Sequence, residues 1–291
     1  MRAQVSLTAT ESKKLLAKAL ANMVPLKNAM EKGMVVVHPS STSLFLIEEL
    51  TGTIPEGLWV CGIIIPKGTC ISREQRETVK RTMKKLEGKK RDPGQFPFTW
   101  FLEKGSFRTG VPLSSILDKM GKEDVYVKGT NAIDPDGKVG VLYAGMGVGT
   151  YGKVIKAYKE KGFTIILPTG LEKLIPVSIE KATQYASRTK MDLAMGIPVG
   201  LFPTPGIVLT EVEAIHILTG AEAVVIAAGG LDGAEGGVTL VIKGSQKQVT
   251  QSFRIIEGVK GASLPKLDPP DCDSCPFVGC HFNTEFKKEF P

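Results

Sequence analysis

The sequence predicts an α/β protein with a Rossmann-like, mostly parallel sheet, a smaller C-terminal α+β subdomain and a cysteine-rich tail. Short apolar runs typical of buried strands alternate with stretches of helical periodicity. Glycine- or hydroxyl-rich loops follow several of these runs. Repeated strand–loop–helix units of this length are typical of a parallel sheet with helices on both faces. Three of the five cysteines lie apart from these units, in the last twenty residues.

Length and composition are those of a globular protein. The chain has 291 residues, of which 42% are hydrophobic and 23% charged, so it can bury a large core. We expect an α/β domain over residues 1–195, the small subdomain over 196–262, and a linker with the cysteine tail over 263–291. No apolar run approaches the ~20 residues that span a bilayer, and the first residues lack the apolar region of a secretory signal. We therefore expect a cytoplasmic protein without membrane contact, and the sequence leaves monomer and homo-oligomer both open.

Helices of the first domain are predicted where apolar residues recur every three or four positions, and strands where β-branched or aromatic residues run together. Asp136-Gly137 marks a hairpin turn between two of the strands. In chain order the expected elements are a helix capped by Thr10 and ending at Met23, a strand at Met34–Val37, a helix at Leu44–Leu50, a strand at Leu58–Ile65, a basic helix, an aromatic strand pair within Phe96–Phe107, a helix at Ser114–Met120, strands at Asp124–Lys128 and Val139–Tyr143, a helix at Lys153–Lys161 and a strand at Phe163–Leu167.

The last part of the chain follows a different pattern. Two helices and two strands are expected without strand–loop–helix alternation, which is typical of an α+β unit. Prolines then predict an extended linker over Leu264–Pro270. The expected elements of this unit are helices at Glu211–Leu218 and Gln246–Ile256 and strands at Ala223–Ala228 and Gly236–Lys243.

The net charge of +7, from 37 Lys and Arg against 30 Asp and Glu, favours a small anionic metabolite as the partner. The densest basic run, Lys80–Arg91, has Val79, Met83 and Leu86 at helical spacing. Its charges are therefore expected to cover the solvent-facing side of one helix. Nucleic acid is disfavoured as a partner because no aromatic residues interleave with these charges for base stacking.

A hydroxyl-rich turn follows the strand Met34–Val37. Backbone N–H groups at a helix start, together with hydroxyl groups, form an anion site. The alternative is an N-cap turn with spare serines, although four consecutive hydroxyl residues exceed what one cap needs. His38, at the strand end, is expected either to line the same pocket or to make a structural hydrogen bond. The four hydroxyl residues are Ser40, Ser41, Thr42 and Ser43.

A second loop, between a strand and a helix, is rich in glycine. Glycine allows the backbone to approach a ligand closely and to turn sharply, so we expect this loop to bind the ligand. The alternative is a loop that only turns the chain. The pattern is not the dinucleotide fingerprint, and neither loop ends in the Gly-Lys-Ser/Thr of a Walker-type loop, so both classes are disfavoured. The glycines are Gly145, Gly147, Gly149 and Gly152.

The order of these segments resembles the superfamily of ribose-5-phosphate isomerase, glucosamine-6-phosphate deaminase and CoA transferases. The resemblance covers about Gly33–Gly170. It is carried by Lys128-Gly-Thr-Asn-Ala-Ile-Asp134 with Asp136-Gly137, by the Gly145–Gly152 loop, and by Ile165-Ile-Leu-Pro-Thr-Gly170. It implies a Rossmann-like sheet that binds a small phosphorylated or CoA-bearing metabolite at the carboxyl ends of its strands. It also implies a transferase- or isomerase-like enzyme.

Two residues are candidates for catalysis. Lys128 is expected to pair with a phosphate or carboxylate, with a lysine that only reaches solvent as the alternative; Asn131 and Asp134 follow it and are expected to contact the ligand. CoA transferases use a glutamate nucleophile, and Glu235, in a glycine-rich loop, is the candidate for that role, with a plain hairpin turn as the alternative. The acidic cluster of the sugar-phosphate isomerases is absent. This absence keeps open a second function, a non-enzymatic ligand- or redox-sensing regulator that uses the cysteine tail.

The tail carries the strongest local chemistry. Cys272, Cys275 and Cys280 lie at C-x2-C-x4-C spacing, and His281 follows directly. Thiolate and imidazole ligands suit tetrahedral zinc or an iron–sulfur cluster. We expect zinc, with an iron–sulfur cluster or no metal as alternatives. In place of His281, the fourth ligand could be Cys61, Cys70, an Asp or water.

Overall fold

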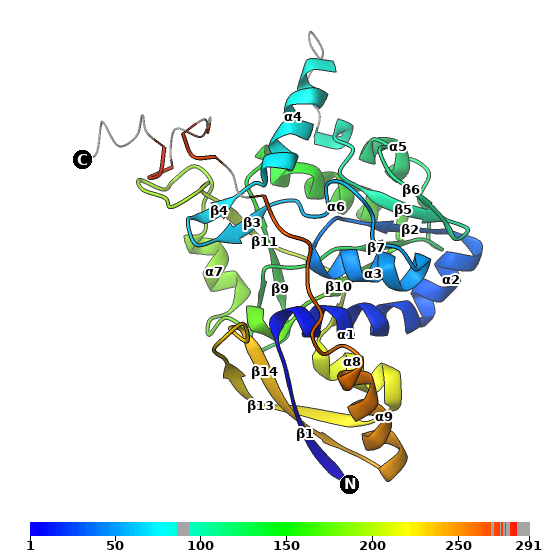
Figure 1. The fold of residues 1–291 in the computed structure, drawn as a ribbon. Helices are drawn as coiled ribbons and strands as arrows, with labels where there is room; N and C mark the ends of the chain where they lie inside the picture. Colours follow the sequence, from blue (N-terminus) through cyan, green and yellow to red (C-terminus); the bar gives the residue numbers. More distant parts are fainter. Residues whose placement is uncertain (86–92, 269–270, 274, 276, 278–279, 284–291) are drawn as a thin grey trace.

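A six-stranded mixed sheet lies at the centre of the protein, with helices on both of its faces (Figure 1). The computed structural model describes residues 1–85, 93–268, 271–273, 275, 277 and 280–283. The strand order in the central sheet is β12–β10–β7–β2–β5–β6. Its strands are β2 (Met34–Val37), β5 (Trp100–Glu103), β6 (Ser106–Arg108), β7 (Val125–Val127), β10 (Thr164–Pro168) and β12 (Ile207–Leu209).

Four neighbouring strands of this sheet, β12, β10, β7 and β2, run parallel to one another. β5 and β6 extend the sheet beyond β2 in the antiparallel sense. Across all the sheets of the described chain, antiparallel pairings outnumber parallel ones. The mixed α/β class is therefore confirmed, whereas a mostly parallel, Rossmann-like sheet is not. The aromatic strand pair expected within 96–107 is present as the β5–β6 hairpin.

Alternation of side chains along the central strands builds two core layers. Val35 and Val37 of β2 belong to the core shared with α1 (Ala9–Asn22) and α3 (Ser41–Thr51). Val36 lies in the opposite core, with α5 (Leu113–Leu117) and α6 (Gly149–Lys161). Successive residues of a strand point to opposite faces, so a run of valines suits a strand that is buried on both sides. Each fully buried aliphatic side chain of this kind contributes about 1.5–3 kcal/mol.

Short elements surround the central sheet. β3 and β4 form a hairpin, and β8, β9 and β11 form a small antiparallel sheet. The strand expected over residues 58–65 is regular only at its end, within β3. The remaining elements are α2 (Val24–Lys32), β3 (Ile63–Ile65), β4 (Gly68–Cys70), α4 (Arg73–Lys85), β8 (Ala132–Ile133), β9 (Val139–Tyr143), α7 (Ile179–Tyr185) and β11 (Gly200–Pro203).

The basic helix is present as α4. Val79 and Met83 are half-buried, while Lys80, Lys84 and Lys85 are exposed, as the helical spacing predicts. Leu86 and the end of the basic run lie outside the described residues. Along the described chain, no helix is both long enough and apolar enough to cross a membrane.

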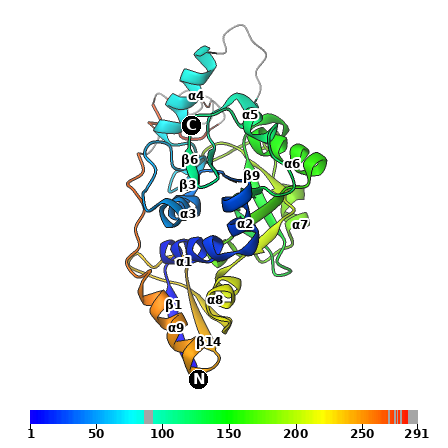
Figure 2. The same cartoon turned by 90° about the vertical axis from the view of Figure 1, so that its right-hand side faces the viewer.

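The small subdomain is built from both ends of the sequence. β1 (Arg2–Leu7) pairs with β14 (Gly237–Lys243), which pairs on its other side with β13 (Glu222–Gly229). α8 (Glu211–Thr219) and α9 (Gln246–Glu257) contact these strands. Strands therefore pair across the expected boundary at residue 195. β1, from the expected first domain, belongs to this small sheet, and β12, from the expected subdomain, belongs to the central sheet. Figure 2 shows this unit at one end of the molecule and α4 at the other, with α1 between them.

Side chains cap the N-termini of α1 and α3. Thr8, rather than the expected Thr10, caps α1, and it forms a capping box with Glu11. Ser40 caps α3 by accepting a hydrogen bond from the backbone N–H of Ser43 at 3.2 Å. The hydroxyl groups of Ser40 and Ser43 also bond to each other at 2.9 Å. The hydroxyl-rich turn thus satisfies one of the backbone N–H groups that a helix start leaves without an intrahelical partner.

Ser40→Ala is expected to lower the free energy of unfolding by about 1 kcal/mol, because the Ser43 N–H loses its acceptor. Ser41→Ala is the matched control, since Ser41 is the first residue of α3 and not its cap. Urea unfolding followed by circular dichroism measures both variants. Equal stability of the two would contradict the capping role.

Candidate functional site

The carboxyl ends of the parallel strands bring separate loops to one edge of the sheet. The chain leaves β2 toward β5 on one side and later enters β7 and β10 on the other, so the strand order reverses between β2 and β7. Ligands of open α/β sheets bind at such a reversal. His38 follows β2 and Lys128 follows β7, and the paired ends Val37 and Val127 hold them next to each other.

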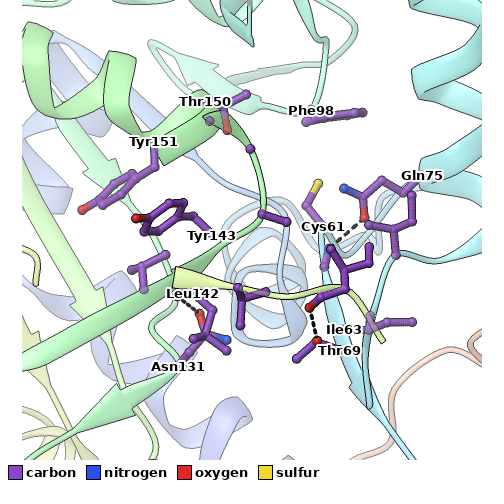
Figure 3. A pocket seen from close by; sticks show the side chains of 18 of the residues that line it. Cys61, Ile63, Thr69, Gln75, Phe98, Asn131, Leu142, Tyr143, Thr150 and Tyr151 are labelled. Atoms are coloured by element: carbon purple, nitrogen blue, oxygen red, sulfur yellow. Dashed lines mark hydrogen bonds between the residues drawn. The ribbon is translucent and has the colours of Figure 1, made fainter. Parts of the chain in front are cut away.

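A cavity of about 340 Å³ opens at this point. Its volume is in the range of small-molecule sites. It contains five of the predicted ligand and catalytic residues: His38, Lys128, Asn131, Gly145 and Gly149. Figure 3 shows Tyr143, Thr150 and Tyr151 on one side of the cavity, and Cys61, Ile63 and Gln75 on the other.

The glycine loop reaches the cavity through an unusual backbone conformation. Gly147, Val148 and Gly149 have successive φ angles of 59°, 63° and 60°. A β-branched residue rarely adopts a positive φ, and such strain is concentrated at functional sites. The loop also closes tightly on α6, because a Cβ on Gly152 would lie 2.1 Å from the carbonyl oxygen of Gly147. Val148, which precedes α6, provides no side-chain cap for this helix.

Lys128 is half-buried and lines the cavity. Burial lowers the pKa of Lys128 to about 8; the neighbouring Cys61 opposes this shift, and the charge of Lys173 adds to it. The Nζ atom of Lys128 lies 5.6 Å from the centre of the Tyr151 ring, within the range of a cation–π contact. No carboxylate is present among the described residues that line the cavity.

His38 is buried beside Lys128. Burial, reinforced by the charge of Lys128, holds the pKa of His38 well below its ordinary value. The imidazole is therefore neutral at physiological pH and provides one hydrogen-bond donor and one acceptor. Its Nδ1 atom lies 3.5 Å from the hydroxyl oxygen of Tyr126. Both expectations for His38 are thus compatible with its position, because it lines the cavity and has a polar neighbour.

Tyr151 was not predicted as a site residue, and Cys61 was predicted only as an alternative metal ligand; both line the ligand cavity. Burial raises the pKa of the Cys61 thiol to about 12, although the charge of Lys128 lowers it and Glu74 adds to the increase. Burial also raises the pKa of Tyr151 to about 12, opposed by a hydrogen bond with Thr204. Nothing local in the sequence marks Cys61, which reaches the ligand cavity only through the fold, whereas Tyr151 lies within the predicted Gly145–Gly152 loop.

The other candidates lie elsewhere. Thr42 and Ser43 are buried, and the turn Ser40–Ser43 does not line the cavity, although Ser40 packs against Gly129. Gly147 is not among the lining residues. Glu235 is exposed in the loop between β13 and β14, and the structure does not bring it to the cavity.

Asp134 is buried and bonded to backbone N–H groups. Its Oδ1 atom accepts hydrogen bonds from Asp136 and Lys138 at 3.0 and 2.9 Å, and its Oδ2 atom accepts one from Ile179 at 2.9 Å. Burial raises the pKa of Asp134, but these hydrogen bonds outweigh it, so the pKa lies below the ordinary value. The carboxylate therefore joins the β8–β9 hairpin to the start of α7 and does not line the cavity.

The tail cysteines reach a second, smaller cavity. Cys272, Cys275 and Cys280 line it together with Cys70, whereas His281 is exposed and is not among the lining residues. Within the described ranges, no group of three or more His, Cys, Asp or Glu side chains converges as the ligands of one metal ion would.

Comparison of the sequence with protein-family models finds no match, and comparison with curated proteins finds none either.

Replacing Asp134 by Asn is expected to lower the free energy of unfolding at neutral pH by about 1–3 kcal/mol, because at least one backbone N–H loses its charged acceptor. The folded-state pKa is lowered. The stabilisation from the carboxylate is therefore present above the ordinary carboxyl pKa and is lost as the pH falls through the folded-state value. Chemical unfolding of both proteins over a pH series measures the difference, which should shrink in acid.

Asp136→Asn is the control for this experiment, because the side chain of Asp136 is exposed in the same turn. We expect it to leave the stability nearly unchanged. A difference between Asp134→Asn and wild type that stays constant down to strongly acidic pH would contradict the role of the carboxylate.

Proposed function

We propose that the cavity between the ends of β2 and β7 binds a small phosphorylated or CoA-bearing metabolite, and that the protein is a transferase- or isomerase-like enzyme. The observation that carries this proposal is the position of Lys128, whose side chain lines the cavity beside the start of α6. A lysine and a helix N-terminus both stabilise negative charge. Among the described residues no carboxylate lines the cavity, so no lining group pairs with Lys128 in place of a ligand.

The environment of Lys128 suits two roles. With a pKa of about 8, about a tenth of the amines are neutral at pH 7 and can accept a proton. A bound phosphate raises the pKa again and keeps the amine charged as its counter-ion. An anionic group that enters the cavity would thus convert the remaining neutral fraction of Lys128 to the charged form.

The parallel strands β2, β7, β10 and β12 support the resemblance to the isomerase, deaminase and CoA-transferase superfamily. We therefore also propose that the fold is Rossmann-like and related to that superfamily. The cavity volume suits a sugar phosphate or the reactive end of a CoA derivative.

A non-enzymatic ligand- or redox-sensing regulator is the second candidate. Two observations favour it: the acidic cluster of the sugar-phosphate isomerases is absent, and the cysteine cavity adjoins the ligand cavity. Cys70, Ile71 and Ile197 line both. Turnover of a bound ligand would favour the enzyme, and binding without turnover would favour the regulator.

Lys128→Ala is expected to weaken binding of an anionic probe by about 10- to 100-fold, the loss that follows removal of a charged hydrogen-bond partner. Isothermal titration calorimetry with inorganic phosphate, ribose 5-phosphate and CoA measures the affinity. Binding should also weaken as the pH rises above 8, because the pKa of Lys128 is about 8 in the free protein and the amine then loses its charge.

Lys156→Ala is the matched control. Lys156 lies on α6, the helix that begins at the cavity, but its side chain is 75% exposed and pairs with Glu160. We expect this variant to bind as wild type does. Failure of all three probes to bind the wild-type protein, or equal binding by Lys128→Ala, would contradict the proposal.

A further inference from the structure

Four cysteines from two distant segments line one cavity of about 30 Å³. Cys70 ends strand β4, and Cys272, Cys275 and Cys280 come from the tail. The fifth cysteine, Cys61, lines the ligand cavity instead.

Cys70 is held in place by its backbone. The N–H of Ile197 donates to the carbonyl oxygen of Thr69 at 2.6 Å, and the hydroxyl of Thr69 donates to the carbonyl oxygen of Ile197, also at 2.6 Å. The chains approach so closely that a Cβ on Gly196 would lie 2.1 Å from the oxygen of Thr69. Cys70 is therefore a fixed part of the cavity wall.

The tail reaches the same wall through several contacts. The linker crosses the molecule from α9 to α4 (Figure 1), where the N–H of Arg73 donates to the carbonyl oxygen of Asp268 at 3.4 Å. Beyond the cysteines, the N–H of His281 donates to the carbonyl oxygen of Ala194 at 2.8 Å. The segment 194–197 thus binds both β4 and the tail.

The tail folds around its own cysteines. The N–H of Cys275 donates to the carbonyl oxygen of Cys272 at 3.3 Å, and the N–H of Cys280 donates to that of Phe277, also at 3.3 Å. The side-chain amide of Asn283 donates to the carbonyl oxygen of Cys275 at 2.8 Å. These bonds turn the chain so that all three cysteines face one cavity.

The arrangement of the four cysteines favours a cluster over a single ion. Tetrahedral zinc has Zn–S bonds of about 2.3 Å, which place its sulfurs only about 3.8 Å apart and leave no room between them. Here the four cysteines, from two separate segments, instead line one cavity of about 30 Å³. The described side chains do not converge as the ligands of one ion would. Four thiolates around such a space are the ligand set of an iron–sulfur cube.

The rest of the cavity wall suits a negatively charged, water-sensitive group. Lys67 donates a hydrogen bond to the sulfur of Cys272 at 3.6 Å, and Arg76 lines the same cavity. Positive charge and hydrogen bonds to the sulfurs stabilise a cluster whose thiolate ligands make it anionic. Apolar residues that exclude water complete the wall: Ile71, Ile197, Phe277 and Phe282.

We propose that Cys70, Cys272, Cys275 and Cys280 bind a [4Fe–4S] cluster, which links the C-terminal tail to strand β4. Cys70 replaces His281 as the fourth ligand, since the imidazole of His281 is exposed and contacts the ring of Phe282 instead. The proposal does not depend on which metabolite enters the ligand cavity. Because Cys70 lines both cavities, loss of the cluster would also disturb one wall of the ligand cavity.

The test is the metal content of the full chain, produced and purified without oxygen. We expect about four iron and four acid-labile sulfide per chain, with broad visible absorption that bleaches on reduction. Cys70→Ala and Cys275→Ala should each lose most of the iron and sulfide, and the absorption with them. Cys61→Ala and His281→Ala are the matched controls and should keep all three.

One zinc and no iron in the wild-type protein would overturn the proposal. So would wild-type iron and sulfide in Cys70→Ala, or loss of iron in His281→Ala with retention in Cys70→Ala. Circular dichroism confirms that each variant is folded. If Cys70→Ala does not fold, Cys275→Ala decides the outcome, because Cys275 lies outside every helix and strand. Full iron content in a folded Cys275→Ala protein would likewise reject the four-cysteine site.

Discussion

The parallel pairing of β2 with β7 is the constraint on which the rest of the site depends. Val37 pairs with Val127, and the N–H of His38 donates to the carbonyl oxygen of Val127 at 2.9 Å. This register places His38 and Lys128 beside each other where the strand order reverses. A shift by one residue would turn every side chain of β2 to the opposite face, exchanging the two core layers. The hydrophobic core therefore fixes the register, and the register fixes the site.

Burial has the same consequence for three titratable groups around the cavity. It lowers the pKa of Lys128 and of His38, and it raises the pKa of Cys61. All three groups are moved toward their neutral forms, because the enclosed cavity solvates charge poorly. An anionic ligand would reverse this for Lys128 by supplying the missing opposite charge. The affinity of the site and its protonation state are thus linked.

The segment 194–197 has a comparable role at the other cavity. It has little regular structure, yet it bonds to β4 through Ile197 and to the tail through Ala194. The contact between Thr69 and Ile197 joins residues 128 positions apart in the sequence, and the nearby bond between Lys67 and Cys272 joins residues 205 positions apart. They also place the cysteine cavity against the ligand cavity, with Cys70 in the wall between them. The extended linker before the tail could not by itself fix where the tail cysteines lie relative to β4.

Local pattern determined most of the elements. The valines of β2, the helical spacing of α4 and the Asp136-Gly137 hairpin could all be predicted, because strand, helix and turn formation depend on neighbouring residues. The same reasoning located His38, Lys128, Asn131 and the glycine loop at strand ends. It could not separate a capping turn from a ligand loop at Ser40–Ser43, since both need the same hydroxyl groups at a helix start.

Tertiary structure decided how these elements combine. Antiparallel β5 and β6 extend the central sheet, and β1 joins a sheet formed mainly by the other end of the chain. The same packing brought Cys61 and Tyr151 to the ligand cavity, and it brought Cys70, among the alternatives to His281, to the tail cysteines. Strand pairing and cavity walls are contacts between residues far apart in the sequence. Such contacts are selected by the burial of whole faces, which no short motif encodes.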